Sequence, residues 1–353
     1  MNTPLQKIIF GSPGTGKSHR VDVEIIPKML GIDVEKSPEN VIKTVFHPEY
    51  THGDFIGKLS PMTRAGKVEY NFYEGHFLSA LSQAYKNIIK AHDKQGNRIE
   101  NVSVENVILV IDEINRGNSS AIFGSIFQLL DRDASGWSSY CITINEIAFT
   151  KILQLIGVEF SYNANGHIDE YKLKPYDGVK LKTLQEKISY LKFDLINKTI
   201  KIPPNLSIVA TMNTSDSSIY YMDSAFKRRW DWKFIDIDSN SISAEGVAFE
   251  NEDEWIAFLK KLNEFIKSSH KYIRGIEDKQ IGRYFIKEKL ITKASVQSKL
   301  MFFLWDSVFA RDKKPLLSLI YDENNSQYHE MITFGDFAKK VDVFIDKIKL
   351  YNV

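Results

Sequence analysis

Short apolar segments alternate with segments of helical period over the first two thirds of the chain. Five apolar segments predict strands, namely Gln6–Phe10, Val41–Phe46, Val107–Ile111, Leu206–Met212 and Lys233–Ile237. Between them, apolar residues recur at helical spacing over 17–30, 77–91 and 119–130. Strands that alternate with helices predict an α/β domain with a mostly parallel sheet.

Three stretches depart from this alternation. Residues 51–75 are rich in Gly, Pro and Asn, and they predict a loop with a short hairpin. Residues 132–204 mix strand-like and helical patterns, which we interpret as an insertion before the fourth strand. Beyond residue 238 the pattern becomes helical, with amphipathic faces. We therefore expect an α/β domain over 1–238 and a smaller helical domain over 239–353.

Composition and charge exclude some classes of protein. The chain has 353 residues, with 46 basic and 45 acidic side chains and a formal net charge of +1. This balance argues against a protein that coats nucleic acid through bulk positive charge, although it permits a local basic patch. The lysine-rich run Tyr171–Lys187, which includes Tyr176, is a candidate patch, and a solvated loop surface is the alternative.

The cysteine count and the apolar runs bear on the cellular compartment. A single cysteine, Cys141, excludes an intrachain disulfide and any zinc site with two thiolates, and it fits a reducing cytoplasm. No apolar run approaches the roughly 18 residues of a spanning helix. The N-terminal residues also lack the basic and then apolar pattern of a secretory signal. We therefore expect a cytoplasmic protein with no membrane contact.

A glycine-rich loop follows the first predicted strand. Its sequence, Gly11-Ser12-Pro13-Gly14-Thr15-Gly16-Lys17-Ser18, matches the phosphate-binding pattern G-x-x-x-x-G-K-[ST] in full. Glycines let successive backbone N–H groups turn toward a polyphosphate, and the next helix offers its positive N-terminus. We expect Lys17 to reach the β- and γ-phosphates and Ser18 to ligate Mg²⁺. The alternative is a glycine turn that matches by chance, which its place between a strand and a helix makes rare.

Two adjacent carboxylates, Asp112 and Glu113, follow the third predicted strand in the sequence VILVIDEINR. The carboxyl ends of strands form the edge where open α/β sheets bind ligands. We expect Asp112 to hold the Mg²⁺ shell and Glu113 to polarise the attacking water as a general base. In the alternative, Asp112 caps the next helix and Glu113 is solvated, but the upstream phosphate loop weakens that reading. Together the two motifs favour hydrolysis over binding alone.

A polar amide and a basic cluster complete the candidate chemistry. Asn213 follows the fourth strand, from where its amide can orient the water from the side opposite Glu113. Arg228 and Arg229 come just before the fifth strand. An arginine there cannot easily reach its own phosphate loop, but in a ring it can enter a neighbour's site and stabilise transition-state charge. A solvated basic turn is the alternative.

Taken in this order, the phosphate loop, DEINR, MNTSD and DSAFKRRW resemble an AAA+ ATPase of the McrB branch, the nucleotide-hydrolysing motor of modification-dependent restriction systems. Two further stretches carry the resemblance, FHPEY followed by DFIG after the second strand, and QIGRYF in the helical domain. The resemblance covers about residues 8–310 without most of the insertion. It implies a five-stranded parallel sheet in the order 5-1-4-3-2 and a smaller α-helical lid.

The resemblance also implies roles for single residues. Asn213 would be the sensor asparagine, and Asp216 the aspartate of the MNT-x-D signature. Arg228 or Arg229 would be the finger that acts in trans. Arg283 lies where a lid-borne sensor stands, although Arg alone replaces the family's His-Ser. The family usually forms hexameric rings, hydrolyses GTP where it is studied best, and is stimulated by an McrC-type nuclease subunit.

Some features set the chain apart from this pattern. The phosphate loop begins at Gly11, so we expect no N-terminal DNA-recognition domain, and no nuclease constellation is evident. We therefore expect DNA to be reached through partners or a ring pore, and to be cut by another subunit. The guanine-reading pattern Asn-Lys-x-Asp is absent, so GTP and ATP both stay open. Two other functions also stay open, a MoxR-like chaperone and a nucleotide switch without motor action.

Overall fold

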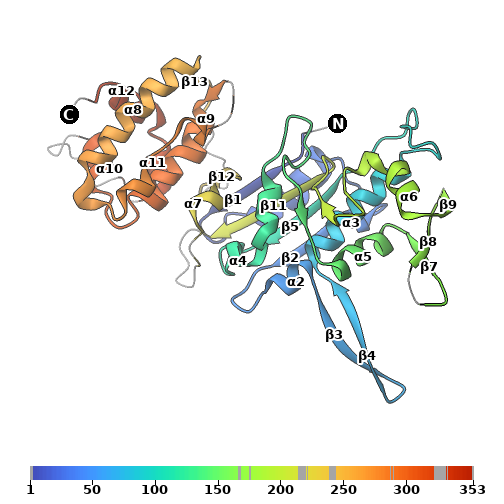
Figure 1. Cartoon of the computed structure of the whole chain (residues 1–353). Coiled ribbons are helices and arrows are strands. Elements are labelled where there is room, and N and C mark those ends of the chain that lie inside the picture. Colours follow the sequence, from blue (N-terminus) through green and yellow to red (C-terminus); the bar gives the residue numbers. More distant parts are fainter. Residues whose placement is uncertain are drawn as a thin grey trace. The chain divides into compact units, whose positions relative to one another are not determined.

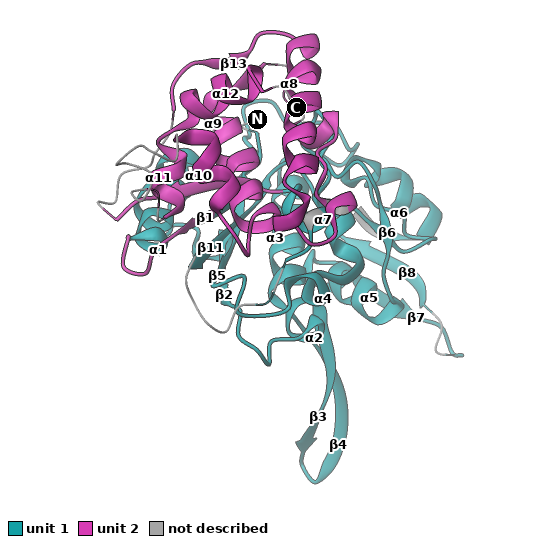
Figure 2. Ribbon diagram, turned by 90° about the vertical axis from the view of Figure 1, so that its left-hand side faces the viewer, with its two compact units in different colours: residues 1–8, 16–229 teal, residues 9–15, 230–353 magenta. Residues whose placement is uncertain are grey.

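The computed structural model describes residues 3–165, 168–174, 176–213, 220, 222–237, 244–286, 288, 290–321, 331 and 333–351 (Figure 1). The chain forms two compact units. The first consists of residues 1–8 and 16–229, and the second of residues 9–15 and 230–353 (Figure 2). This division precedes the expected boundary at residue 238 and assigns the last strand of the main sheet to the second unit.

The main sheet has five strands in the order β12-β1-β11-β5-β2. Their bounds are Gln6–Gly11 for β1, Val41–Val45 for β2, Val107–Asp112 for β5, Leu206–Asn213 for β11 and Asp231–Ile235 for β12. Counted along the chain within this sheet, these are the fifth, first, fourth, third and second strands. The labels run further because the remaining strands lie in smaller sheets. The last strand begins at Asp231 and not at Lys233, as the sequence had indicated.

The middle of the sheet explains the apolar runs. Strand β5 pairs in parallel with β2 on one side and with β11 on the other. All but the last residue of β5 and of β11 are buried, so neither strand shows the alternation of a half-exposed strand. The polar residues that end these strands, Asp112 and Asn213, are the first that are partly exposed. Asp112 and Asn213 therefore lie next to each other in the sheet's strand order, at the carboxyl ends of β5 and β11.

Helices flank these strands in the first unit. They are α1 (Lys17–Arg20), α2 (His52–Ile56), α3 (His76–Lys90), α4 (Ser119–Phe123), α5 (Glu146–Leu155), α6 (Leu181–Lys187) and α7 (Ser224–Lys227). Helix α1 continues as a π-helix over Val21–Met29, with Pro27 inside it. The helix expected over 119–130 is α-helical only to Phe123 and then forms a 3-10 helix. The change falls at Gly124, whose φ of 51° interrupts the α-helix.

The two irregular stretches of the first unit contain small sheets. Strands β3 (Gly57–Arg64) and β4 (Lys67–Glu74) form an antiparallel hairpin. The insertion holds the pair β6 (Ile142–Thr143) with β10 (Thr199–Ile200), and the sheet of β7 (Glu159–Tyr162), β8 (Ile168–Leu173) and β9 (Tyr176–Val179). The short hairpin expected in 51–75 is thus a long one, with eight residues in each strand, preceded by helix α2.

The second unit is mostly helical beyond β12. Its α-helices are α8 (Glu252–Ser268), α9 (Lys293–Ser295), α10 (Lys314–Ile320), α11 (Phe334–Ala338) and α12 (Val341–Lys349), and β13 (Val247–Phe249) pairs with β14 (Ile291–Thr292). Trp255 and Phe258 of α8 are buried and stack on each other with ring centroids 5.8 Å apart. Among the described residues, no helix is both long enough and apolar enough to cross a membrane.

Candidate functional site

The glycine-rich loop has the backbone that its sequence predicts. Gly14 and Gly16 adopt φ values of 82° and 78°, in the left-handed region that favours glycine. A Cβ atom on Gly11 would lie 2.2 Å from the carbonyl oxygen of Ile235, so only glycine fits there. The Thr15 hydroxyl donates to the carbonyl of Ser12 at 3.0 Å and braces the turn. The loop therefore presents a fixed backbone and leads directly into α1.

Asp112, at the carboxyl end of β5, accepts hydrogen bonds from hydroxyl groups of two other segments. Ser18 Oγ at the start of α1 donates to Asp112 Oδ1 at 3.0 Å, and Thr211 Oγ1 of β11 donates to the same oxygen at 2.7 Å. The parallel register sets Ala210 beside Ile111, so the next residues, Thr211 and Asp112, end their strands together. Both residues predicted to bind Mg²⁺ are thus in direct contact.

The donor set at Asp112 suits magnesium. Mg²⁺ prefers oxygen ligands and usually keeps several waters, with one or two carboxylates and the phosphates of the substrate completing its shell. Ser18 and Asp112 supply one hydroxyl and one carboxylate. The described residues contain no cluster of three or more His, Cys, Asp or Glu side chains that would form a cage for a metal held by protein alone. The site therefore fits a cation shared with a polyphosphate.

Glu113 is held by the end of β11. Its Oε1 accepts a hydrogen bond of 2.7 Å from Asn213 Nδ2, and its backbone N–H donates to Thr211 Oγ1 at 3.3 Å. Glu113 has a φ of 54°, which is uncommon for a residue other than glycine and marks a backbone held by its surroundings. Asn213 thus contacts the predicted base itself, whereas the sequence had suggested that the two side chains flank a water.

Two residues of this network were not singled out from the sequence. Thr211 contacts both acidic residues, and the buried Asn115 donates from Nδ2 to the carbonyl of Asn213 at 3.0 Å. A signal for Thr211 exists, because alternation along a strand places it on the same face of β11 as Asn213. Asn115 lies in the turn after Glu113, where no periodicity predicts the direction of a side chain.

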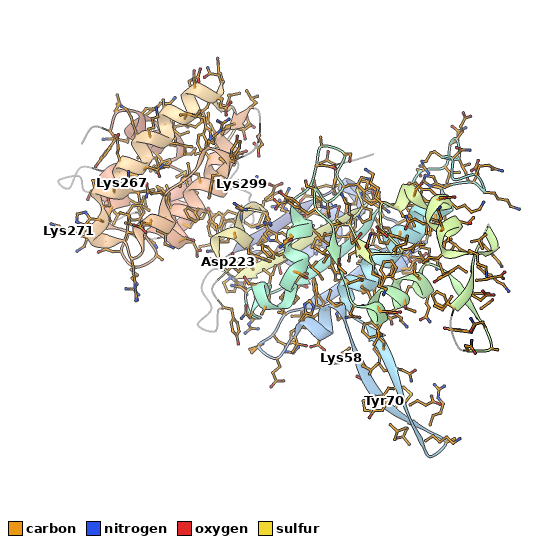
Figure 3. The ribbon with its side chains drawn as sticks, viewed as in Figure 1. Lys58, Tyr70, Asp223, Lys267, Lys271 and Lys299 are labelled. Atoms are coloured by element: carbon orange, nitrogen blue, oxygen red, sulfur yellow. The ribbon has the colours of Figure 1, made fainter. Side chains whose placement is uncertain are left out.

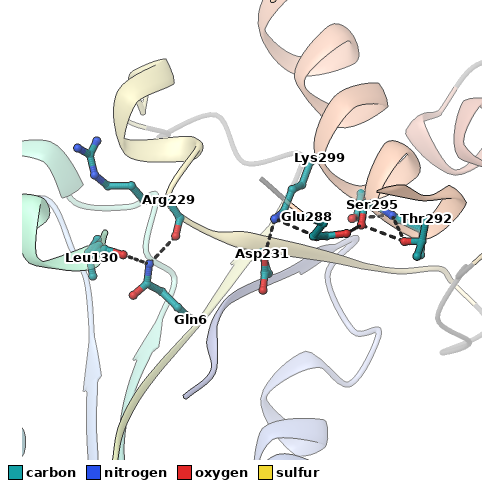
Figure 4. A network of polar contacts seen from close by, with 10 residues as sticks. Gln6, Leu130, Arg229, Asp231, Glu288, Thr292, Ser295 and Lys299 are labelled. Atoms are coloured by element: carbon teal, nitrogen blue, oxygen red, sulfur yellow. Dashed lines mark hydrogen bonds and ion pairs between the residues drawn. The ribbon is translucent and has the colours of Figure 1, made fainter. Parts of the chain in front are cut away.

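The two candidate arginines have different surroundings. Arg229 is nearly buried, with 7% of its side chain exposed. It forms a two-point ion pair with Asp131, at 2.8 Å from Nη2 and 3.0 Å from Nε, and its Nη1 donates to the carbonyl of Ala225 at 2.6 Å. Its own carbonyl accepts from Gln6 Nε2 at 2.5 Å (Figure 4). Arg228 is exposed and joins none of the ion pairs found among the described residues.

Two further residues were predicted from the sequence, Arg283 and Asp216. Arg283 belongs to the second unit, where it forms an ion pair with Glu252 and lies 4.6 Å from the ring centroid of Tyr284. Asp216 lies outside the described residues. Asp223, labelled in Figure 3, accepts from Ser120 Oγ at 2.8 Å and from the Phe226 N–H at 2.7 Å, so it caps α7.

Comparison with known proteins agrees with the resemblance to McrB. The chain is 28% identical over 371 residues to the type II restriction enzyme BsuMI component YdiS of Bacillus subtilis, which covers 97% of this chain and 88% of that protein. It is 27% identical over 233 residues to the EcoKMcrB subunit of the type IV methyl-directed restriction enzyme of Escherichia coli, which covers 65% of this chain and 35% of that protein. No protein-family model matches the chain. The resemblance to McrB-like proteins of restriction systems is confirmed.

Proposed function

We propose that the chain is the nucleotide-hydrolysing AAA+ motor subunit of a restriction complex. The observation that carries the proposal is a hydrogen-bonded network in which Ser18, the last residue of the phosphate-loop motif, joins Asp112 and Thr211, and which Glu113 and Asn213 continue. This network supports a metal-binding role for Ser18 and Asp112 next to Glu113, whose carboxylate accepts a hydrogen bond from an amide. The similarity to two restriction-system proteins supports the biological setting.

The residues divide the chemistry among them. Loop amides and Lys17 would bind the phosphates of GTP or ATP. Ser18 and Asp112 would hold Mg²⁺, which supplies positive charge to the phosphate oxygens when it is bound. Glu113 would accept a proton from the attacking water, and Asn213 would hold the Glu113 carboxylate in place through the 2.7 Å hydrogen bond. Thr211 would hold the Asp112 carboxylate and the Glu113 backbone in fixed positions through its two hydrogen bonds.

The assembly belongs to the same proposal. Arg228 is the better candidate for a finger acting in trans, because it is exposed while Arg229 is engaged with Asp131. A finger of this kind needs a neighbouring copy, so we propose a ring, hexameric as in the family it resembles. We further propose an McrC-like nuclease partner, with DNA reached through that partner or the ring pore. Neither comparison names a chaperone, and no observation favours the MoxR-like alternative.

Turnover of ATP and GTP measured side by side, with and without Mg²⁺, tests the proposal. We expect Mg²⁺-dependent release of phosphate by the wild-type chain. We expect Glu113→Gln to lower the turnover rate by about 100-fold or more while nucleotide still binds, because the amide accepts no proton. Lys17→Ala serves as the control that loses binding. Equal turnover by Glu113→Gln and the wild type would rule out the catalytic role of Glu113.

A further inference from the structure

The β3–β4 hairpin extends away from the body of the first unit in both views (Figures 1 and 2). Its pairing is continuous from Gly57 opposite Glu74 to Arg64 opposite Lys67. Ala65 and Gly66 form the turn, with φ values of 50° and 76°, as a tight two-residue hairpin turn requires. An isolated two-stranded hairpin is marginally stable in water at best, so its exposed surface calls for an explanation.

The base of the hairpin is fixed to the unit that carries it. A Cβ atom on Gly75, the residue after β4, would lie 2.3 Å from the backbone of Phe55 in α2. Glu74 at the end of β4 forms an ion pair of 3.0 Å with Lys151 of α5. This close approach and the ion pair fix the direction in which the hairpin leaves the fold. It is therefore presented as an arm and not as a slack loop.

One face of the arm is apolar and exposed. Residues directly opposite each other in an antiparallel pair share a face. The register therefore places on one side the group that we call the apolar face, Leu59, Pro61, Thr63, Val68, Tyr70 and Phe72. Leu59, Val68 and Tyr70 are 52%, 60% and 67% exposed, and Figure 3 shows Tyr70 on the arm, far from its base. None of these six residues is charged, and the one charged residue that the register places on the same side, Glu74, lies at the base of the hairpin opposite Gly57.

The other face is mixed and the tip is charged. Met62 and Tyr73, 37% and 40% exposed, lie on that face among polar and charged residues. Lys58 pairs with Asp54 at 2.7 Å near the base, and Ser60 lies opposite Asn71 in the middle. At the tip Arg64 lies directly opposite Lys67, and neither joins an ion pair among the described residues. Like charges that face each other across two strands are unfavourable, and an anionic group between them would remove the repulsion. The tip thus favours an acidic neighbour.

These features select the kind of occupant. Pro61 has no N–H to offer at the edge of β3, which disfavours the addition of another strand there. The apolar face combines aliphatic side chains with Tyr70 and includes no basic residue, whereas single-stranded nucleic acid is bound by aromatic stacking along a basic groove. A cluster of exposed apolar side chains with a polar rim is typical of a protein interface.

We propose that the apolar face of the β3–β4 arm docks a protein component of the same restriction complex. That component would offer an apolar strip with carboxylates next to Arg64 and Lys67. The inference rests on the proposed function only for the identity of this partner. Docking would bury Leu59, Val68 and Tyr70 together, with the two tip charges giving direction to the contact.

The test measures binding of the purified full-length chain to the purified nuclease-type component encoded with it. The double variant Val68→Lys/Tyr70→Lys disrupts the apolar face. Ser60→Lys/Asn71→Lys adds the same charge to the opposite face of the same hairpin and serves as the matched control. We expect the first variant to raise the dissociation constant at least about tenfold and the control to leave it near the wild-type value. We expect Arg64→Glu to weaken binding as well, most strongly at low salt.

Melting temperature and basal nucleotide turnover are recorded for every variant, and both should stay at the wild-type level. Equal effects of the two double variants, or no effect of either, would overturn the inference. The inference would also fail if the apolar-face variant still bound the protein partner but lost affinity for a duplex or single-stranded 30-mer DNA. It would fail as well if that variant still bound the partner but changed its own oligomeric state in sedimentation. If the wild-type chain hydrolysed no nucleotide, that result would count against the proposed function. It would not affect the docking inference, which is tested by the dissociation constant for the partner alone.

Discussion

At the scale of single residues, Thr211 connects the two carboxylates of the site. Its hydroxyl donates to Asp112 and accepts from the backbone N–H of Glu113. The residue is 2% exposed, so water cannot replace either bond. The sequence predicts Asp112, Glu113 and Asn213 because carboxylates and amides at strand ends are typical of phosphate chemistry. It gives little reason to choose Thr211, since a threonine inside an apolar run is ordinary in strands.

Replacing Thr211 by valine tests this link. Valine keeps the shape of the side chain but removes the hydroxyl, so Asp112 loses one of its two hydroxyl donors. We expect nucleotide binding to persist, turnover to fall about 10- to 100-fold, and half-maximal turnover to need more Mg²⁺. Thr211→Ser, which keeps the hydroxyl, should restore both values. A Mg²⁺ titration of turnover that is identical for Thr211→Val and the wild type would contradict the assignment.

At the scale of elements, the buried strands were predicted well and the hairpin poorly. Strands β5 and β11 lie in the middle of the sheet, and continuous burial leaves an apolar run that is visible in the sequence. The hairpin exposes both faces, so its strands carry Ser, Pro, Thr and Asn beside Leu, Val and Tyr, a mixture that resembles a loop. The π-helix over Val21–Met29 was also missed, because its apolar spacing does not differ enough from an α-helix.

Helix α2 and the start of the hairpin share one ionised side chain, and this predicts a dependence on pH. Asp54 accepts from Lys58 Nζ at 2.7 Å and from the N–H and hydroxyl of Thr51 in a capping box. The hydrogen bond from Lys58, aided by those from Thr51, lowers the pKa of Asp54 from 3.8 to about 2. A carboxylate whose pKa is lower in the folded state stabilises the fold above its unfolded pKa, and the effect disappears as pH falls through the folded value.

Asp54→Asn should therefore be less stable than the wild type at pH 5, and the difference should shrink between pH 4 and pH 2. The effect will be modest, because Asp54 and Lys58 lie near the surface, where solvent screens their charges. Urea unfolding followed by circular dichroism at several pH values in this range measures it. A second substitution, Glu35→Gln, removes an exposed carboxylate that joins none of the ion pairs found among the described residues, and it shows how much of the change belongs to the site at Thr51. A difference that stays constant with pH would refute the role of the Asp54 charge.

At the scale of the whole molecule, the near-neutral net charge of +1 has a narrower meaning than it first had. It argues against bulk binding of nucleic acid, but a motor subunit of the proposed kind would need basic groups only at its phosphate loop, at an arginine acting in trans and at its docking surfaces. Arg228 shows how far the sequence alone could go. From the sequence, Arg228 and Arg229 were equally good candidates for the finger. Only the structure distinguishes them, because Arg229 packs against Asp131, and burial of a side chain depends on tertiary contacts.

Mixed assemblies of two variants test the arrangement of neighbouring copies. Lys17→Ala removes the phosphate contact of its own site, and Arg228→Ala removes the finger that a copy would lend to its neighbour. We expect each variant alone to hydrolyse nucleotide at least about 100-fold more slowly than the wild type. An equal mixture should recover up to about one quarter of the wild-type rate. A site works only where an Arg228→Ala copy receives the intact arginine of a Lys17→Ala copy.

Arg229→Ala is the control that separates a finger from a structural arginine. It removes the ion pair from Asp131 in a nearly buried setting, so it should lower the free energy of unfolding by about 3 kcal/mol. Arg228→Ala should leave the melting temperature unchanged, because the Arg228 side chain is exposed. Thermal melting and turnover of the mixtures are measured on the same samples. If mixing restores nothing, or if Arg228→Ala alone turns over nucleotide at the wild-type rate, catalysis does not depend on an arginine supplied across an interface.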